Sequence, residues 1–127
     1  MPHILVVDDE PEIVKMVGRI LEGRGHRVST ARDGQEALDA VERERPDLLI
    51  IDLNLPKLDG WEVTRRLRAG ATPKDLPIVM MTAAFPTVAD ADRGLTVGAD
   101  EYVVKPFLRE VLLHNVERLL AKAAPAP

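Results

Sequence analysis

The chain has 127 residues, of which 46% are hydrophobic and 30% charged, a composition that favours one folded domain over a disordered segment. Its formal net charge of -4 at pH 7 argues against a nucleic-acid-binding surface, which would need a concentrated basic patch. The absence of cysteine excludes disulfides and thiolate metal sites, and no apolar run approaches the roughly 20 residues of a membrane helix.

The first half of the chain alternates between short apolar runs and helical patterns. Residues 4–7 form a continuous apolar run, which favours a strand buried on both faces. Residues 11–23 carry apolar side chains at helical spacing, with proline near the start and glycine at the end. Residues 27–30 alternate and predict an edge strand. Residues 33–45 predict a helix that opens with Asp and Glu at capping-box spacing, and residues 48–51 predict a second buried strand.

The second half repeats the alternation. Residues 60–69 and 108–120 have helical periodicity, and the latter pattern is strongly amphipathic. Residues 78–81 form a third apolar run, and residues 102–104 predict a short strand at the other edge. Residues 87–97 carry few apolar side chains and a glycine in the middle, so we expect a marginal helix there.

Five strands alternating with five helices predict an α/β fold with right-handed crossovers, a doubly wound five-stranded parallel sheet. Because the three most apolar strands belong inside, we expect the strand order 2-1-3-4-5 of the flavodoxin-like (βα)5 arrangement. We expect a single domain over residues 1–121 and an Ala/Pro-rich tail or linker stub over residues 122–127.

Polar residues follow the predicted strands where each one ends. They are Asp8, Asp9, Glu10, Asp52, Thr82 and Lys105. Because ligands bind outside the carboxyl ends of parallel strands, these side chains should meet at one edge of the sheet. Carboxylates crowded there would repel one another, and Mg²⁺, which prefers oxygen ligands, would relieve the repulsion.

Each residue also has a simpler interpretation. Asp8 and Asp9 could form a solvated acidic loop that caps the following helix. Asp52 could cap a turn, because the residues after it are rich in turn formers, whereas the functional interpretation makes it a carboxylate nucleophile for phosphorus. That chemistry needs a further cation and a hydroxyl, which Lys105 and Thr82 would supply.

The joint pattern resembles the CheY-like receiver domains of bacterial two-component response regulators, over about residues 3–120. The motifs that carry this resemblance are Ile4-Leu5-Val6-Val7-Asp8-Asp9-Glu10, Asp52-Leu53-Asn54-Leu55-Pro56 with Asp59-Gly60, Met81-Thr82-Ala83, Gly98-Ala99-Asp100 and Lys105-Pro106-Phe107.

The resemblance implies a role for each residue of the site. Asp52 would accept the phosphoryl group, and Lys105 would bind the phosphoryl oxygens. Asp9 and Asp52 would bind Mg²⁺ directly, Asp8 would bind it through water, and the backbone carbonyl of Asn54 would complete the protein ligands. No organic cofactor is implied, and the peptide bond between Lys105 and Pro106 would be cis.

The resemblance also implies a switch and partners. Thr82 would swing toward the phosphate and Tyr102 would turn inward, although an exposed edge-strand position is the simpler interpretation of Tyr102. The movement would reshape the face formed by residues 87–97, the last strand and the last helix. A sensor histidine kinase or phosphotransfer protein would donate the phosphoryl group, and a downstream protein or a second copy would bind that face.

The resemblance further implies a signalling module, which catalyses only its own phosphotransfer and slow autodephosphorylation. Because no signal-peptide pattern opens the chain, we expect a cytoplasmic protein without nucleic-acid or membrane contacts. Asn54 and Ala84 stand at positions that vary in this family near the attacking water, so the lifetime of the phosphorylated form is left open.

Three other functions share parts of this pattern. An aspartate-dependent phosphohydrolase would need a carboxylate two residues after Asp52, where Asn54 stands. A flavin-nucleotide binder would need a Gly/Ser/Thr-rich loop after the first strand, where the acidic residues would repel phosphate. A receiver that acts only as a phosphorylation-independent binding module would not need the complete set of residues, and it remains an alternative.

The remaining polar and aromatic residues have structural interpretations. The histidines lack ligand spacing and are expected in surface or packing positions, the three arginines of residues 65–68 are expected on a solvated helix face, and Trp61 is expected to pack beside Gly60.

Overall fold

The computed structural model describes residues 2–69, 76–82 and 99–123. They form a parallel sheet in the order β2-β1-β3-β4-β5, which confirms the predicted fold. The strands are β1 (His3–Val7), β2 (Arg27–Ala31), β3 (Leu48–Asp52), β4 (Ile78–Thr82) and β5 (Glu101–Val104). The predicted helix over residues 87–97 lies outside the described residues. The predicted tail also lies outside them, apart from its first two residues, which belong to the last helix.

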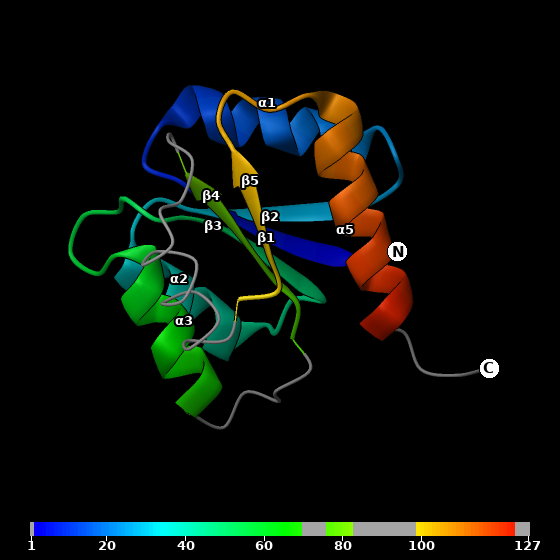
Figure 1. Ribbon diagram of the computed structural model, residues 1–127. Coiled ribbons are helices and arrows are strands. Elements are labelled where there is room, and N and C mark those ends of the chain that lie inside the picture. Colours follow the sequence, from blue (N-terminus) through cyan, green and yellow to red (C-terminus); the bar gives the residue numbers. More distant parts are fainter. Residues whose placement is uncertain (1, 70–75, 83–98, 124–127) are drawn as a thin grey trace.

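Helices cover both faces of the sheet (Figure 1). One face carries α1 (Pro11–Glu22) and α5 (Arg109–Ala123), and the other carries α2 (Gly34–Arg43) and α3 (Gly60–Ala69). Every residue of β1, β3 and β4 is buried, as the continuous apolar runs predict for strands covered on both sides. None of the described helices is long and apolar enough to cross a membrane.

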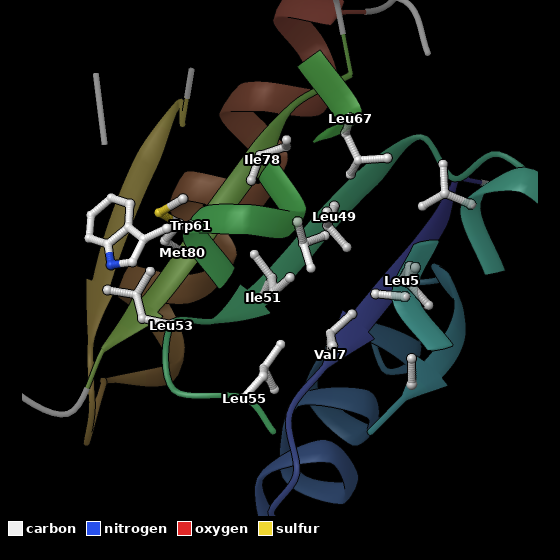
Figure 2. Close-up of a cluster of buried hydrophobic side chains, with 14 of the residues drawn as sticks. Leu5, Val7, Leu49, Ile51, Leu53, Leu55, Trp61, Leu67, Ile78 and Met80 are labelled. Atoms are coloured by element: carbon white, nitrogen blue, oxygen red, sulfur yellow. The ribbon is translucent and has the colours of Figure 1, made fainter. Parts of the chain in front are cut away.

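Two buried clusters fill the space on either side of the sheet. Figure 2 shows the cluster under α2 and α3, with Trp61 and Leu53 at one end and Leu5 at the other. The second cluster lies under α1 and α5 and includes Val17 and Leu112. Because alternate residues of a strand point to opposite faces, each of the buried strands β1, β3 and β4 contributes side chains to both clusters.

The predicted cap of α2 is confirmed at Asp33, the N-cap residue, but the helix ends two residues before its predicted end at residue 45. The Asp33 side chain accepts a hydrogen bond of 2.8 Å from the Glu36 amide, as an N-cap should. The Glu36 carboxylate accepts from the Arg32 amide, 3.2 Å away, one residue before the N-cap. The helix stops at Arg43, because Glu44 is extended and pairs with a strand residue, Arg27.

The prediction of a solvated arginine face is correct for two of the three arginines of α3. Arg65 and Arg66 are exposed and pair with Glu62 on the same helix. Arg68 is half-buried, and its guanidinium donates to the Leu76 carbonyl and to the Asp100 carboxylate, at 2.7 and 3.0 Å. Arg68 therefore anchors the chain at the start of β4.

The histidines occupy the surface or packing positions that the sequence predicts. His3 is buried, with its Nε2 atom 2.7 Å from the Ser29 hydroxyl, and His26 lies against Glu117. His114 is exposed on α5. The group of potential metal ligands found in the described part of the chain contains no histidine.

Candidate functional site

The sheet brings the polar residues predicted from the sequence to one edge. Asp8 follows β1, Asp52 and Thr82 are the last residues of β3 and β4, and Lys105 follows β5. The strands are in register there, with Asp52 beside Met81 and Thr82 beside Val104. The candidate site therefore lies at the carboxyl ends of four adjacent strands, next to the point where the strand order reverses between β1 and β3.

A glycine holds the chain close to the backbone of Asp52. The Gly60 amide donates to the Leu53 carbonyl at 3.0 Å, so the start of α3 folds back onto the end of β3. A Cβ atom at Gly60 would lie 2.6 Å from the Asp52 carbonyl oxygen, closer than real side chains approach. Only glycine fits here without moving the residue that carries the central carboxylate.

We expect Gly60→Ala to lower the free energy of unfolding by about 1–3 kcal/mol, the usual cost of overpacking a tight site. Gly18→Ala, in the middle of α1, is the matched control, because a Cβ atom there would meet only Val28 at an ordinary 3.9 Å. That control should be neutral or should gain up to about 1 kcal/mol of helix propensity. Urea unfolding of both variants tests the prediction, and equal effects would contradict the close approach at Gly60.

Three acidic side chains converge after β1. One carboxylate oxygen from each of Asp8, Asp9 and Glu10 lies within 4.8 Å of the other two. Asp8 is fully buried and accepts a hydrogen bond from the Glu10 amide at 2.9 Å, whereas Asp9 and Glu10 are exposed. Adjacent oxygens around an octahedral Mg²⁺ are about 3 Å apart, so the group gathers carboxylates near one another but would have to draw closer to bind the ion through all three.

Lys105 joins this acidic group to Asp52. Its Nζ atom lies 2.7 Å from Asp8 Oδ2, 3.5 Å from Asp52 Oδ2 and 3.6 Å from Glu10 Oε1. Burial alone would lower the pKa of Lys105, but the hydrogen bond to Asp8 and the charges of the carboxylates outweigh it and raise the pKa. The ammonium group therefore stays charged and offsets part of the negative charge of the site.

The Asp52 carboxyl is buried and holds its proton more tightly than an ordinary aspartate. Burial raises its pKa, and the nearby charge of Asp8 raises the pKa further. The Lys105 charge and a hydrogen bond from the Asn54 backbone oppose the rise without cancelling it. Asp52 is thus a carboxylate with little solvation, a state that favours attack on an electrophile once a cation offsets its charge.

The backbone of Thr82 fixes the start of the segment that carries Lys105. The Lys105 amide donates to the Thr82 carbonyl at 2.6 Å, and the next peptide bond, between Lys105 and Pro106, is cis as the family resemblance implies. The Thr82 side chain is itself buried, at 8% exposure. The hydroxyl, the ammonium and the Asp52 carboxylate are thereby placed on three neighbouring strand ends.

Tyr102 is half-buried on β5 and packs against the cluster under α2 and α3. Its ring centroid lies 6.2 Å from that of Trp61, with the two planes tilted by 58°. This arrangement differs from a fully exposed edge aromatic, the simpler interpretation of the sequence. Trp61 is buried as predicted, but its contact with Tyr102 has no signal in the sequence, because the two residues meet only once α3 packs on the sheet.

Glu10 is the site residue to which the sequence analysis assigns no role. It belongs to the acidic group and lies 3.6 Å from the Lys105 ammonium. The sequence places Glu10 at this edge, because three consecutive acidic residues follow a buried strand, but it gives no signal for the contact with Lys105. Asn54, by contrast, is exposed, and its amide rather than its side chain faces Asp52.

Comparison with known proteins links this geometry to one family. The family described as "Response regulator receiver domain" matches residues 4–117. The response regulator MprA of Mycobacterium leprae is 44% identical over 123 residues, which cover 97% of this chain and 53% of that protein. MprA of Mycolicibacterium vanbaalenii is 43% identical, with 97% of this chain and 52% of that protein covered. The chain thus spans about half the length of these curated relatives.

Solved structures share the fold closely. The Vibrio cholerae chemotaxis protein CheY4 has a TM-score of 0.88 and 37% identity, with 94% of this chain and 98% of that chain covered. A signal receiver domain of a histidine kinase from Syntrophus aciditrophicus has a TM-score of 0.90 and 31% identity, with 100% and 96% covered.

Proposed function

This chain belongs to the response regulator receiver domain family, and we propose that the Asp52 carboxylate is the group that accepts the phosphoryl group in two-component signalling. One observation carries the assignment to this residue. Asp52 is a buried carboxylate whose Oδ2 atom lies 3.5 Å from Lys105, a cation that also contacts the acidic group after β1.

The transfer is a displacement at phosphorus. An Asp52 carboxylate oxygen forms a bond to phosphorus while the bond between phosphorus and a donor histidine nitrogen breaks, and the electron pair stays on that nitrogen. Lys105 donates to the phosphoryl oxygens, for which it must share or leave its 2.7 Å contact with Asp8. The Thr82 hydroxyl, on the next strand end, donates to the same oxygens. A sensor histidine kinase or phosphotransfer protein is the proposed donor.

The acidic group fits a divalent cation. Asp9 and Asp52 would bind Mg²⁺ directly with the Asn54 carbonyl, and Asp8 would bind it through water; Glu10 lies close enough to assist. When bound, Mg²⁺ neutralises part of the charge that carboxylates and phosphoryl oxygens bring together. The protein's own part is to hold these oxygens at the end of rigid strands.

The output is a contact with another protein. Phosphorylation would draw Thr82 toward the phosphate and Tyr102 further inward, and would change the exposed face of β5 and α5. Residues 87–97, which the family resemblance adds to this face, lie outside the described residues. A downstream protein, an effector domain or a second copy would bind this face. We propose a cytoplasmic signalling module whose only catalysis is its own phosphotransfer and slow autodephosphorylation.

A variant that lacks one proposed Mg²⁺ ligand tests the metal part of the proposal. Asp9→Asn removes an exposed carboxylate from the acidic group and should weaken Mg²⁺ binding about tenfold or more, because a direct ligand contributes at least as much as the groups that orient it. Isothermal titration calorimetry with Mg²⁺ measures the affinity of each variant directly. Glu42→Gln removes an exposed carboxylate outside the site and should leave the affinity unchanged; equal weakening in both variants would contradict the assignment.

Mapping the modified residue tests the phosphoacceptor itself. After treatment with acetyl phosphate and Mg²⁺, reduction with borohydride marks an acyl phosphate, and peptide mass spectrometry locates the mark. We expect it on Asp52. A mark on Asp9 or Asp59, or a phosphate on Thr82 that resists hydroxylamine, would assign the chemistry to a different residue.

A further inference from the structure

An open groove lies between α1 and the edge strand β2, and none of its lining residues belongs to the proposed phosphorylation site. It encloses about 460 Å³, within the range of volumes that protein binding pockets use. Its walls and floor are formed by Pro11, Val14, Lys15, Gly18, Arg19, Glu22, Val28, Thr30 and Arg32. Because the groove is open to the surface and runs beside a strand edge, it fits a chain segment better than an enclosed small molecule.

The groove exists because α1 covers β1 and leaves the outer strand partly uncovered. Val17 and Leu21 of α1 are fully buried in the cluster on that side of the sheet. On β2, Val28 is half-buried and Thr30 is exposed, and alternation places both on the α1 side of the strand. Gly18 lines the groove and leaves space in it, because even a Cβ atom there would lie 3.9 Å from Val28.

The groove is positively charged in a protein of net charge -4. Lys15, Arg19 and Arg32 line it against a single carboxylate, Glu22. None of these three cations is among the ion pairs of the described residues. Other surface arginines do form ion pairs, namely Arg24 with Glu117, Arg27 with Glu44, and Arg118 with Glu101. The cations around an apolar floor complement an acidic segment that carries apolar side chains.

The backbone of β2 is available along the same edge. The Arg27 amide donates to the Pro2 carbonyl, and the Ala31 carbonyl accepts from the Asp8 amide, so these alternate residues face β1. Val28 and Thr30 therefore direct their backbone groups to the other side. Within the described part of the chain, β2 ends the sheet there, and an extended partner segment could add to it as a further strand.

We propose that the groove between α1 and β2 docks an extended acidic segment of a partner protein, which pairs with the edge of β2 and places apolar side chains over Gly18 and Val28. Lys15 and Arg32 bind its carboxylates. The groove shares no residue with the phosphoacceptor assignment, so binding should persist in an Asp52→Asn variant and the two proposals stand or fall separately.

Selection from a display library of random decapeptides tests the proposal. We expect the selected peptides to be rich in Asp and Glu with apolar residues at alternate positions. Their affinity should fall about tenfold or more in Lys15→Glu/Arg32→Glu, because attraction becomes repulsion at two contacts. Arg43→Glu/Lys122→Glu is the matched control, with the same change of net charge outside the groove, and should bind as the wild type does.

A second variant and an NMR measurement test the location of the docking site without changing the charge of the protein. Gly18→Leu fills the floor without altering the charge and should also weaken binding. Amide shifts on peptide addition should centre on Val28 and Thr30. Peptides without acidic enrichment, shifts centred on β5 and α5, or affinity insensitive to both groove variants would overturn the proposal. If no peptide is selected and the protein instead self-associates in a way that Lys15→Glu/Arg32→Glu abolishes, the proposal is overturned, and the groove binds a second copy of the chain.

Discussion

Replacing Asp52 with asparagine should make the metal-free protein more stable at neutral pH while it removes the proposed function. We expect a gain of roughly 0.5–2 kcal/mol in the free energy of unfolding, the range that single stabilising substitutions commonly reach. The reason is electrostatic. The Asp52 carboxyl is buried beside the Asp8 charge, and the Lys105 ammonium, 3.5 Å away, does not fully compensate. Asparagine keeps the shape of the side chain and removes the charge.

The pH dependence of this gain has a definite sign. Burial, and then the charge of Asp8, raise the pKa of Asp52 above the ordinary value of 3.8. The native protein therefore keeps this proton at pH values where the unfolded chain has lost it, and the stability falls as the pH rises through that window. The advantage of Asp52→Asn should be complete above the raised native pKa and should disappear as the pH falls below the ordinary value.

Urea unfolding of the wild type and Asp52→Asn across this pH range measures the effect. Glu42→Gln, on the exposed surface of α2, has the same change of net charge and should show no comparable gain. A variant that is less stable than the wild type at neutral pH, or an advantage that grows on acidification, would contradict the electrostatic account. Added Mg²⁺ should stabilise the wild type more than the variant, because Asp52 is a proposed ligand.

Replacing Lys105 with methionine should have the opposite and larger effect. Asp8 is fully buried, and its Oδ2 atom lies 2.7 Å from the Lys105 ammonium. Methionine fills the space but leaves that carboxylate without its cation. Removing one partner of a buried pair costs about 3–5 kcal/mol, and we expect the lower end of this range because 11% of the Lys105 side chain is exposed.

A double-mutant cycle separates the ion pair from a general packing defect. Asp8→Asn in the Lys105→Met background removes the uncompensated charge and should restore most of the lost stability. Lys57→Met is the matched control, since Lys57 is 69% exposed, lies 3.4 Å from Asp33 and should be dispensable. A Lys105→Met protein as stable as the wild type, or a loss that Asp8→Asn does not relieve, would show that the contact between Lys105 and Asp8 contributes little.

The architecture was predictable because its signals are local. The continuous apolar runs at β1, β3 and β4 require burial on both faces, and that requirement places these strands inside the sheet. The cap at Asp33 is likewise a contact between residues three apart. Once the strand order is known, Asp8, Asp52, Thr82 and Lys105 must meet at one edge, because the carboxyl ends of parallel strands coincide.

The unpredicted features depend on contacts between distant parts of the chain. Lys105 and Asp8 are 97 residues apart, and the closer contact of Lys105 with Asp8 than with Asp52 follows from strand register and rotamers, not from a motif. In the sequence Arg68 cannot be told from the solvated Arg65 and Arg66. Its hydrogen bond to the Leu76 carbonyl forms only because the chain before β4 lies beside α3 in the fold. Nothing in the sequence around Gly60 shows that a Cβ atom at this position would lie only 2.6 Å from the Asp52 carbonyl oxygen.

The central claim, that Asp52 accepts the phosphoryl group at a site completed by Mg²⁺, is tested most directly by the intact mass of the protein. The wild type is incubated with acetyl phosphate in the presence and absence of Mg²⁺, beside Asp52→Asn, and sampled by rapid quench so that fast hydrolysis does not hide the product. We predict a gain of one phosphoryl group that requires both Mg²⁺ and Asp52. An adduct that persists in Asp52→Asn, or no adduct in the wild type at any quench time while Mg²⁺ binding is demonstrated separately, would contradict the claim and favour a phosphorylation-independent binding module.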